Sequence, residues 1–371
     1  MDAFYASVEL LRYPELRGLP VVVGGGSATA PLTRPDGTRE FRQLRGYTGR
    51  GVATTSTYEA RALGVFSAMG LMKAAQLAPD AFLLPADFTQ YRKYSRLFKD
   101  AVLQIATRME DRGIDEIYLD LTEFGTQAPE VARSIKAAVQ QATGLTCSIG
   151  LAPNKLLAKI GSDLDKPDGF TVLSYDSVSE RIWPLPVRKI NGIGPKSGER
   201  LNALGILTVG DLAKSPPDLL QKHFGLSNAR WLLAAAHGRD DRSVQTQSEP
   251  KSFSRETTFE RDLHAVRDRQ ELSGIFTGLC EQVARDLQRK SYEGRTIGIK
   301  LRFADFRTVT RDLTLPEPTC LPEVIRHAAG QCLKRVPLEQ RIRLLGVRVG
   351  SVSQRGEESA EQGRLRQLTL Y

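Results

Sequence analysis

Residues 113–120 read Gly-Ile-Asp-Glu-Ile-Tyr-Leu-Asp and place two neighbouring acids, Asp115 and Glu116, inside an apolar run. The apolar positions predict a strand or a hairpin that they anchor to the core. Burying a charge is costly unless it is paired or bound to a metal ion, so the two carboxylates favour a site for a hard cation such as Mg2+. A solvent-facing hairpin tip is the competing interpretation of this stretch taken alone.

Strand and helix patterns alternate around this stretch. Short apolar runs predict strands at residues 18–23, 114–121 and 146–151. Apolar residues at helical spacing predict helices at residues 54–75, 88–109 and 154–163. Residues 24–51 are rich in Gly, Thr, Pro and Arg, which predicts a long surface loop. We therefore expect the N-terminal half to mix helices with strands.

The C-terminal half separates into further parts. Residues 174–238 carry short helical patterns divided by turn signals and predict a small all-helical unit. A polar connector at 243–250 precedes a block whose alternating apolar residues, at 296–303 and 344–351, indicate a sheet. The residues from 353 onward are polar and are expected to form a tail.

Length and composition exclude several classes of protein. At 371 residues the chain exceeds the size at which one core stops growing, so we expect several packed units. The chain is 41% hydrophobic and 26% charged, and no apolar run reaches the length of about 20 residues that a membrane span needs. The opening Met-Asp-Ala-Phe-Tyr lacks the basic and apolar regions of an export signal, so we expect a cytoplasmic protein.

Charge and cysteine spacing narrow the chemistry. The net charge of +9 favours nucleic acid as a partner, although many basic proteins bind none. The four cysteines stand far apart, in no metal-ligand spacing, and are expected to be buried thiols. The catalytic residues are therefore sought among the carboxylates.

A glycine-rich stretch predicts a nucleic-acid contact. Residues 190–197 read Ile-Asn-Gly-Ile-Gly-Pro-Lys-Ser and resemble a helix-hairpin-helix element. Gly192 and Gly194 allow close backbone approach, and the N–H groups that open the next helix, at Lys196, can bind a phosphate without reading base identity. A plain glycine turn between packed helices is the alternative.

A basic segment in the last block predicts a second contact. Residues 285–311 hold eight Lys or Arg against three acids, and Lys300 and Arg302 fall on a predicted strand. Such a row could line a duplex through phosphate contacts that carry little sequence preference. A solvated face is the ordinary explanation of a charge run.

Several stretches together resemble the Y-family DNA polymerases of the DinB type. The opening Met1-Asp-Ala-Phe-Tyr-Ala-Ser-Val-Glu9 is similar to the start of that family. Four later stretches follow in the family's order and spacing: Tyr58-Glu-Ala-Arg61, Ile114-Asp-Glu116, Ser148-Ile-Gly150 with Lys155 and Lys159, and Lys166-Pro-Asp-Gly169. The similarity continues through the helical unit and, more weakly, through the last block.

The resemblance implies an α+β fold in the form of a right-hand polymerase. Its parts would be a palm, fingers, a helical thumb with the helix-hairpin-helix, and a mixed α/β little-finger domain. In this sequence they would span 1–19 and 88–173 (palm), 20–87 with an insert at 24–51 (fingers), 174–239 (thumb), 240–250 (linker), 251–352 (little finger) and 353–371 (tail).

The resemblance also implies roles for individual residues. Asp115 and Glu116 would be catalytic and, with the backbone carbonyl of Met1, would bind two Mg2+ ions about 3.5–4 Å apart. Tyr5 would be the steric gate that excludes a 2'-hydroxyl. The other nucleotide-binding residues would be Phe4, Thr55, Tyr58, Arg61 and Lys166. The cations and hydroxyl donors of this set suit a triphosphate because they offset its negative charge.

The implied reaction is low-fidelity, template-directed DNA synthesis in translesion synthesis. Its partners would be primer-template DNA and deoxynucleoside triphosphates, bound by a monomer. The final residues Gln367-Leu-Thr-Leu-Tyr371 resemble the peptide by which bacterial polymerases bind the sliding clamp. The implied clamp contacts are Gln367, Leu368, Leu370 and Tyr371, and tethering of this kind raises local concentration at the primer end.

The sequence departs from the family pattern in two places. Family members carry a short apolar strand that ends in an acid directly before the position of Met1, and that first catalytic aspartate is absent here. Asp2 is no obvious substitute, because a shift of one residue along a strand turns a side chain to the other face. The insert at 24–51 is longer than the family's connection and carries five arginines.

Two explanations of the absent acid remain open. A reading frame started too late would hide codons for an apolar stretch that ends in aspartate, and we favour this one. A decayed polymerase would instead act as a DNA- and clamp-binding accessory protein on the same fold. A helix-hairpin-helix repair nuclease is a remoter alternative that leaves Tyr5 and Lys166 without a role.

Overall fold

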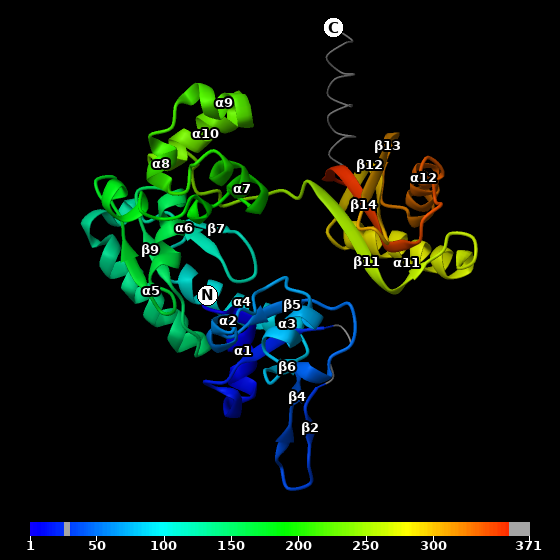
Figure 1. The fold of residues 1–371 in the computed structure, drawn as a ribbon, viewed down its shortest axis with the longest axis horizontal. Coiled ribbons are helices and arrows are strands. Elements are labelled where there is room, and N and C mark those ends of the chain that lie inside the picture. The colour runs from blue at the N-terminus through cyan, green and yellow to red at the C-terminus, as the bar shows by residue number, and fades with distance from the viewer. Residues whose placement is uncertain (26–29, 356–371) are drawn as a thin grey trace. The chain divides into compact units, whose positions relative to one another are not determined.

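The computed structural model describes residues 1–25 and 30–355 and divides the chain into two compact units. The first unit is Met1–Gln247, and the second begins at Ser248. Figure 1 shows helices and strands mixed within each unit, as the alternating sequence patterns predict. Within the described ranges, no helix combines the length and the apolar character that a membrane crossing requires.

A four-stranded sheet, which we call the β1 sheet, forms around the apolar run at 18–23. Its order is β4 (Arg42–Gln43), β6 (Phe82–Leu84), β1 (Val21–Gly24) and β5 (Ala53–Ser56). Strand β1 is parallel to β6 and antiparallel to β5. Every residue of β1 is buried, which agrees with a run of valines in an inner strand.

The helix expected at 54–75 is wrong at its start. Residues 53–56 form strand β5, and two short helices follow, α2 (Tyr58–Ala62) and α3 (Leu71–Leu77). The β-branched residues Thr54 and Thr55 suit a strand, and Thr55 lies opposite Val23 of β1. Pairing with the sheet therefore prevails over the helical spacing of the apolar residues.

The described part of the stretch at 24–51 holds more secondary structure than the surface loop that its composition predicts. It contains β2 (Leu32–Thr33), β3 (Arg39–Glu40), β4 and the single turn η2 (Leu44–Gly46). Strand β4 extends the edge of the β1 sheet by pairing with β6, and Leu44 is buried in the core beneath. Strands β2 and β3 form a hairpin that projects from this sheet in Figure 1.

Acids close to this hairpin pair with its arginines. Arg34 lies 3.1 Å from Glu40 on the opposite strand. Arg39 lies 3.1 Å from Glu15 and donates a hydrogen bond of 2.9 Å to the carbonyl of Arg12. The hairpin is thus tied to the segment that follows helix α1 (Phe4–Arg12).

Two small sheets carry the acidic stretch and the apolar run at 146–151. Strands β7 (Met109–Asp111) and β8 (Ile117–Leu119) form an antiparallel hairpin, and β9 (Ile149–Leu151) is parallel to β10 (Phe170–Val172). Within the described residues, β8 and β9 each pair on one edge only. Helices α4 (Phe88–Leu103) and α5 (Ala128–Thr143) pack against each other and place apolar residues beside both strands.

Short helices make up the rest of the first unit. They include α6 (Lys155–Leu164), α7 (Pro195–Ala203), α8 (Val209–Ala213), α9 (Pro217–Phe224) and α10 (Leu226–Ala236), together with the single turns η4 (Val178–Ile182) and η5 (Val187–Lys189). Asn154 caps α6 by accepting the Leu157 N–H at 3.0 Å. Thr208 and Asp211 form a capping box on α8. The capping box on α8 is an example of the start signals that predict a helical unit at residues 174–238.

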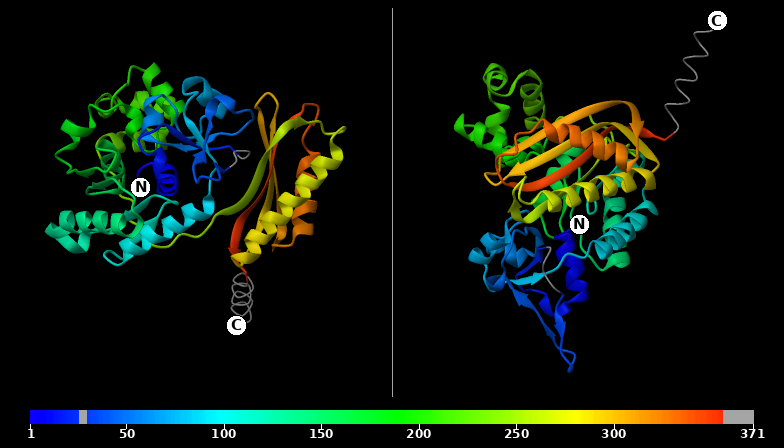
Figure 2. Two further views of the ribbon diagram at one scale, coloured as in Figure 1. Left: turned by 90° about the horizontal axis from the view of Figure 1, so that it is seen from below. Right: turned by 90° about the vertical axis from the view of Figure 1, so that its right-hand side faces the viewer.

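The second unit is one antiparallel sheet covered by two helices on one face (Figure 2). The strand order is β11 (Ser252–Leu263), β14 (Ile342–Gln354), β12 (Tyr292–Phe303) and β13 (Thr308–Thr319), and the helices are α11 (Arg269–Arg289) and α12 (Pro322–Lys334). Residues Ile297, Ile299 and Leu301 are buried at every second position of β12, which confirms the predicted alternation.

All four cysteines are free and buried, as their spacing predicts. Cys147 lies in the core beside α4 and α5, and the other three lie in the core of the second unit. Burial raises the pKa of the Cys280 thiol to about 11, which keeps it protonated and inert at neutral pH.

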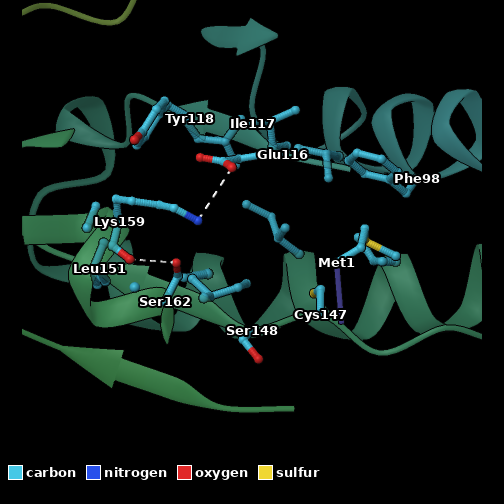
Figure 3. A pocket seen from close by; sticks show the side chains of 18 of the residues that line it. Met1, Phe98, Glu116, Ile117, Tyr118, Cys147, Ser148, Leu151, Lys159 and Ser162 are labelled. Atoms are coloured by element: carbon cyan, nitrogen blue, oxygen red, sulfur yellow. Dashed lines mark hydrogen bonds and ion pairs between the residues drawn. The ribbon is translucent and has the colours of Figure 1, made fainter. Parts of the chain in front are cut away.

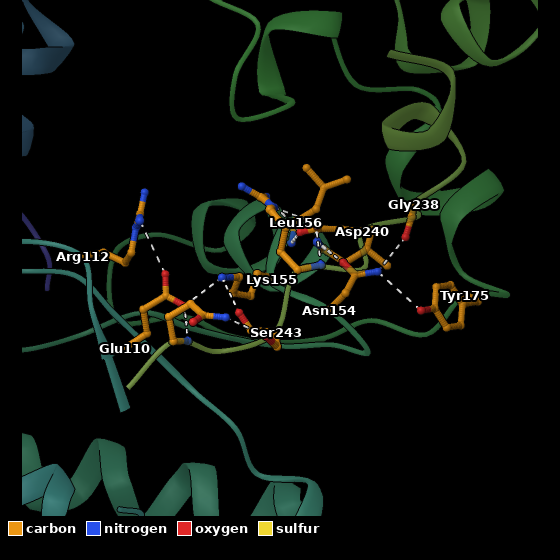
Figure 4. Close-up of polar contacts among 12 residues, drawn as sticks. Glu110, Arg112, Asn154, Lys155, Leu156, Tyr175, Gly238, Asp240 and Ser243 are labelled. Atoms are coloured by element: carbon orange, nitrogen blue, oxygen red, sulfur yellow. Dashed lines mark hydrogen bonds and ion pairs between the residues drawn. The ribbon is translucent and has the colours of Figure 1, made fainter. Parts of the chain in front are cut away.

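Residues 238–245, near the end of the first unit, are held in place by a set of hydrogen bonds that we call the linker clasp (Figure 4). Buried Glu110 of β7 accepts hydrogen bonds from the Lys155 ammonium at 2.7 Å and from the Gln245 N–H at 2.8 Å. Lys155 also donates to the carbonyl of Ser243 at 2.8 Å. Asp240 accepts the Leu156 N–H at 3.0 Å, at the start of α6. The chain before the second unit is therefore held against α6 and β7.

The environment of Glu110 sets its charge. Burial raises the pKa of its carboxyl, but the hydrogen bonds from Lys155 and Gln245 and the charges of Lys155 and Arg112 outweigh this effect, so the pKa lies below the ordinary value of 4.5. A carboxylate with a lowered pKa in the folded state contributes stability above its unfolded pKa. That contribution is lost as the pH falls through the folded value.

We predict that Glu110→Ala releases the clasp. Lys155 and the Gln245 N–H would lose their buried partner, and breaking a buried ion pair costs about 3 kcal/mol of unfolding free energy. Chemical denaturation of the variant and the parent at neutral pH measures the loss, and hydrogen exchange reports loss of protection at Gln245. The difference in stability between the two proteins should shrink as the pH falls below 4.5.

Asp111→Ala is the matched control, because Asp111 is on the same strand and pairs with Lys99 at 2.8 Å while its side chain is 58% exposed. Exposed pairs contribute at most about 1 kcal/mol. Equal destabilisation by both variants, or unchanged exchange at Gln245 in Glu110→Ala, would contradict the clasp.

Candidate active site

A cavity of about 250 Å³ lies between the unpaired edges of β8 and β9, and we call it the acid cavity. In Figure 3, Ile117 and Tyr118 line one side of it, Leu151 and Ser148 line the other, and Met1 lies at one end. Asp115 and Glu116 also line the cavity. The structure thus brings the acidic stretch, the start of the chain and β9 to one place.

The two acids occupy the turn that leads into β8. The Met1 amino group donates a hydrogen bond of 2.8 Å to the Asp115 carbonyl, so the first residue of the chain holds this turn. Glu116 lies 3.4 Å from the Lys159 ammonium of α6. The acids face the cavity and a cationic helix, and this placement differs from a hairpin tip that points into solvent.

Helix α6 and the turn after it supply the positive charge of the site. Lys159 contacts Asp163 at 3.6 Å as well as Glu116, and Lys166 contacts Asp163 at 2.8 Å. Burial raises the pKa of Asp163, but Lys166 and Lys159 outweigh it, so the net pKa is lowered. Burial lowers the pKa of Lys166, but Asp163 outweighs it, so the net pKa is raised. Both groups are charged at neutral pH.

Tyr5 lies in an aromatic cluster at the start of α1. Its ring centroid is 4.4 Å from that of Tyr91 and 5.8 Å from that of Phe88, and 5.7 Å from that of Phe4. Burial raises the pKa of Tyr5, and the charge of Asp115 raises it further. Phe88 and Tyr91 were not among the sequence candidates, although their spacing of three residues on α4 could have indicated one aromatic face.

A buried carboxylate supports this cluster from behind. Glu9 is 1% exposed, and it accepts a 2.6 Å hydrogen bond from the Tyr91 hydroxyl and a 3.1 Å contact from Arg12. Burial raises the pKa of Glu9 above its ordinary value despite both donors. Burial and the bond to Glu9 also raise the pKa of Tyr91, so its hydroxyl stays a donor.

The structure places Tyr58 and Arg61 together at the start of α2. The Arg61 guanidinium lies 4.8 Å from the centre of the Tyr58 ring. Burial raises the pKa of Tyr58, and the charge of Asp2 raises it further, while the charges of Arg61 and Lys166 lower it. The Tyr58 hydroxyl is buried and makes no hydrogen bond to any described residue, which leaves a polar atom for a ligand. Thr55 is buried in β5.

The carboxylates at the acid cavity suit a divalent cation bound together with a phosphate substrate. Mg2+ is usually held by one or two carboxylates plus substrate phosphates and water, and Asp115 and Glu116 are two carboxylates on one turn. Within the described residues, no cluster of three or more His, Cys, Asp or Glu side chains could hold a metal ion. Asp2 does not join the acid pair, because its carboxylate accepts hydrogen bonds from Ser148 and from the Asp168 N–H.

The glycine stretch at 190–197 forms the turn before α7. Gly192 has φ of 111°, and a Cβ there would lie 2.8 Å from Trp231, so only glycine fits this position. Gly194 is the exposed N-cap of α7 and provides no side-chain cap. Lys196 is exposed in the first turn of that helix. The N–H groups at this helix start are therefore available to an anion.

The basic residues of β12 lie on the sheet face that the helices leave open. Lys300 and Arg302 alternate with buried Ile299, Leu301 and Phe303. Lys300 lies 2.8 Å from Glu256, and Arg302 donates to Thr308 at 3.2 Å. Arg348 is exposed on β14 opposite Gly298 on the same face, and it was not a sequence candidate. Its position between the buried residues Val347 and Val349 is the alternation that could have placed Arg348 on the open face.

The expected clamp contacts Gln367, Leu368, Leu370 and Tyr371 lie outside the described residues. Of the sequence candidates, the structure describes those around the acid cavity and those on the two basic surfaces.

Three stretches of the chain match known family models. Residues 1–163 match the impB/mucB/samB family, residues 250–370 match the C-terminal domain of that family, and residues 175–206 match its HHH motif. Together these stretches include the lining of the acid cavity except Lys166, the glycine turn and the sheet of the second unit.

Curated proteins are similar along nearly the whole chain. A DNA polymerase IV of Methanoculleus marisnigri is 41% identical over 351 residues, which cover 94% of this chain and 92% of that protein. A DNA polymerase IV of Xanthomonas axonopodis pv. citri is 38% identical over 370 residues, which cover 98% of this chain and 96% of that protein.

Solved structures are similar as well. A Y-family DNA polymerase chimera of Dbh and Dpo4 has a TM-score of 0.79 at 26% identity, with 95% of this chain and 97% of that chain covered. An insertion ternary complex of Dbh DNA polymerase has a TM-score of 0.63 at 26% identity, with 94% and 96% covered.

We predict that Glu9→Gln changes how stability depends on pH. A carboxyl whose folded pKa is raised contributes stability below its unfolded pKa, and that contribution is lost as the pH rises through the folded value. The variant lacks this titration, so it should gain stability relative to the parent as the pH rises above the ordinary carboxyl pKa of 4.5. Denaturation midpoints at several pH values measure the change.

Glu59→Gln, at an exposed position of α2, is the control and should follow the parent at every pH. A constant difference between Glu9→Gln and the parent across this range would show that burial does not govern the charge of Glu9.

Proposed function

The chain belongs to the impB/mucB/samB family of Y-family DNA polymerases, and from this we propose that the acid cavity is the catalytic site of a DNA polymerase of the polymerase IV type. The protein is a template-directed DNA polymerase that adds deoxynucleotides to a primer and acts in translesion synthesis with low fidelity. The family and the α+β right-hand fold that the sequence resemblance implied are thereby confirmed.

One observation carries the assignment of the site. The turn that holds Asp115 is bound to the Met1 amino group, and Met1, Tyr5 and Ile114 pack in one apolar cluster. A polymerase needs a sugar-facing surface next to its metal ligands, because the reacting phosphate is joined to that sugar. Tyr5 and the acid pair meet this requirement.

We assign the metal to this acid pair. Members of the family depend on divalent metal ions, and two Mg2+ ions held by Asp115, Glu116 and the Met1 carbonyl are our proposal for this chain. When bound, such ions activate the attacking hydroxyl and offset charge on the leaving group. Glu116 would exchange its contact with Lys159 for this role, which frees the ammonium to stay with Asp163.

The protein's own side chains bind and orient the nucleotide. Lys166 and Arg61 would bind the triphosphate as cations, and the Tyr58 hydroxyl would donate the hydrogen bond that it does not make within the described residues. Tyr5 would exclude a ribose 2'-hydroxyl, with Phe4 next to it. Thr55 is buried in β5 and would support the sheet under this surface.

Primer-template DNA would contact two surfaces. The first is the helix start at Gly192, Gly194 and Lys196, where backbone N–H groups can bind a phosphate. The second is the open sheet face with Lys300 and Arg302, to which we add Arg348. Ternary complexes of a relative support DNA and deoxynucleoside triphosphates as substrates.

We propose the remaining organisation by the same resemblance. Residues 1–19 and 88–173 are the palm, 20–87 the fingers, 174–239 the thumb, 240–250 the linker and 251–352 the little finger. The tail after residue 352 would bind the sliding clamp, and the protein would act as a cytoplasmic monomer. The linker clasp supports the linker assignment at its first residues, 240–245.

The acid cavity has the lining and the free edges that an extended strand needs. It is bordered by β8 and β9, whose facing edges are unpaired, and by apolar residues of α4 and α5 such as Phe98 and Ile135. Burial lowers the pKa of the Met1 amino group, and a peptide bond there would replace this costly charge with a neutral N–H. We propose that the cavity can accept a strand added before Met1, whose final aspartate would be a third carboxylate beside the acid pair.

We predict that such a strand raises activity. The tested protein carries six added residues of alternating apolar pattern that end in Asp directly before Met1, and the matched control ends in Asn. Primer extension with Mg2+ should be on the order of 100-fold or more faster with Asp than with Asn, because metal-bound charge stabilisation is worth several kcal/mol.

The chain without the addition is measured beside both, and DNA binding is measured for all three. If every version, including the one with the added Asp, binds DNA but does not extend the primer, the result would favour the accessory-protein alternative. Extension that is equal with Asp and Asn would contradict the third ligand.

A further inference from the structure

Asp2 is a buried carboxylate whose two oxygens are both engaged. It is 2% exposed. One oxygen accepts the Ser148 hydroxyl at 2.7 Å, and the other accepts the Asp168 N–H at 2.9 Å. A carboxylate only accepts hydrogen bonds, so it matches two donors that approach from different segments.

The segment that Asp2 holds is the turn at residues 166–169. Asp168 adopts a left-handed backbone with φ of 58°, which is unusual for a residue other than glycine. Ser148 accepts the Gly169 N–H at 3.2 Å while it donates to Asp2, so the carboxylate fixes the turn both directly and through Ser148. Lys136 of α5 pairs with the Asp168 side chain from the other side.

Asp2 also joins this turn to the elements that carry the rest of the site. Its N–H donates to the Thr146 carbonyl at 3.2 Å, just before β9. Its own carbonyl accepts the Ser7 hydroxyl at 2.7 Å, in helix α1 with Tyr5. One residue therefore sets the turn against both the start of α1 and the strand that borders the acid cavity.

Lys166 opens the turn that Asp2 fixes. Its ammonium is held by Asp163 at 2.8 Å, and its backbone is two residues from the N–H that Asp2 binds. A lysine side chain is flexible, so its ammonium is directed at one phosphate only when its backbone is fixed. Positional freedom would weaken that charged contact. The position of this turn therefore decides where the cation of Lys166 points.

We propose that Asp2 is a positioning residue for Lys166: its two carboxylate oxygens fix the turn at 166–169 and so direct the Lys166 ammonium to the nucleotide triphosphate. This inference rests on the proposed nucleotide-binding role of Lys166. Asp2 itself contacts neither metal nor nucleotide. Its function differs from that of the acid pair, although it stands next to Met1 in the chain.

Asp2→Asn tests the proposal with nearly unchanged volume. An amide can keep the Asp168 N–H on its oxygen, but its NH2 group can only donate to Ser148, so that hydrogen bond reverses and both contacts lose the carboxylate charge. The full chain is bound to primer-template DNA with a dideoxy-terminated primer, so no bond forms. The dissociation constant of the complementary deoxynucleotide is then measured with Mg2+ by the fluorescence of 2-aminopurine in the template.

We expect about tenfold weaker nucleotide binding for Asp2→Asn, with DNA affinity unchanged. Ser148→Ala should weaken binding in the same direction by a smaller factor, because it removes only the indirect support. The decisive comparison is a double-mutant cycle with Lys166→Ala. If Asp2 acts through Lys166, adding Asp2→Asn to Lys166→Ala should weaken binding no further.

Asp165→Asn is the matched control. Asp165 directly precedes Lys166 in the chain, and its carboxylate accepts a hydrogen bond from the Thr171 hydroxyl. It should lower the melting temperature without changing nucleotide affinity, which separates positioning from stability. If Lys166→Ala leaves nucleotide affinity unchanged, the proposed role of Lys166 fails. If Lys166→Ala weakens binding but Asp2→Asn does not, or if the two effects add, the positioning role of Asp2 is overturned.

Discussion

The site depends on the contact between the turn that carries Asp115 and the first residue of the chain. The Met1 amino group binds the Asp115 carbonyl, and this bond sets the acid pair at the rim of the acid cavity. Lys159 of α6 pairs with Glu116, one of the two acids. Opposite charges at short distance in a partly buried place stabilise each other more than they would in water. The acids therefore face inward, where a metal-bound substrate can reach them.

Two buried carboxylates near the start of the chain bind groups that lie next to the proposed site. Glu9 binds Tyr91, which packs against the Tyr5 ring. Asp2 binds the turn that carries Lys166. Each carboxylate accepts hydrogen bonds from protein groups, which offset part of the desolvation cost of burial. For Glu9, burial still prevails and raises the pKa. The Tyr5 ring and the turn at Lys166 are thus both held from behind.

The sequence predicted those features that depend on local patterns. Alternation in β12, the valine run of β1 and the cap at Asn154 each follow from neighbouring residues, because side-chain period and capping act within one turn or strand. The helix expected over 54–75 was wrong at its start because pairing of Thr55 with β1 lies outside any local window. The loop expected at 24–51 likewise contains β4, whose partner β6 is about forty residues away.

The sequence by itself determined the family, because its motifs follow one another in the family's order. The roles of the acid pair and of the nucleotide-facing residues follow from that resemblance and stay predictions. Tertiary structure alone decided which buried groups support them. Asp2 was read from its register as a poor metal ligand, and only the fold shows that its oxygens bind Ser148 and Asp168. Contacts between residues more than a hundred positions apart leave no local pattern, since they arise when separate strands and helices pack together.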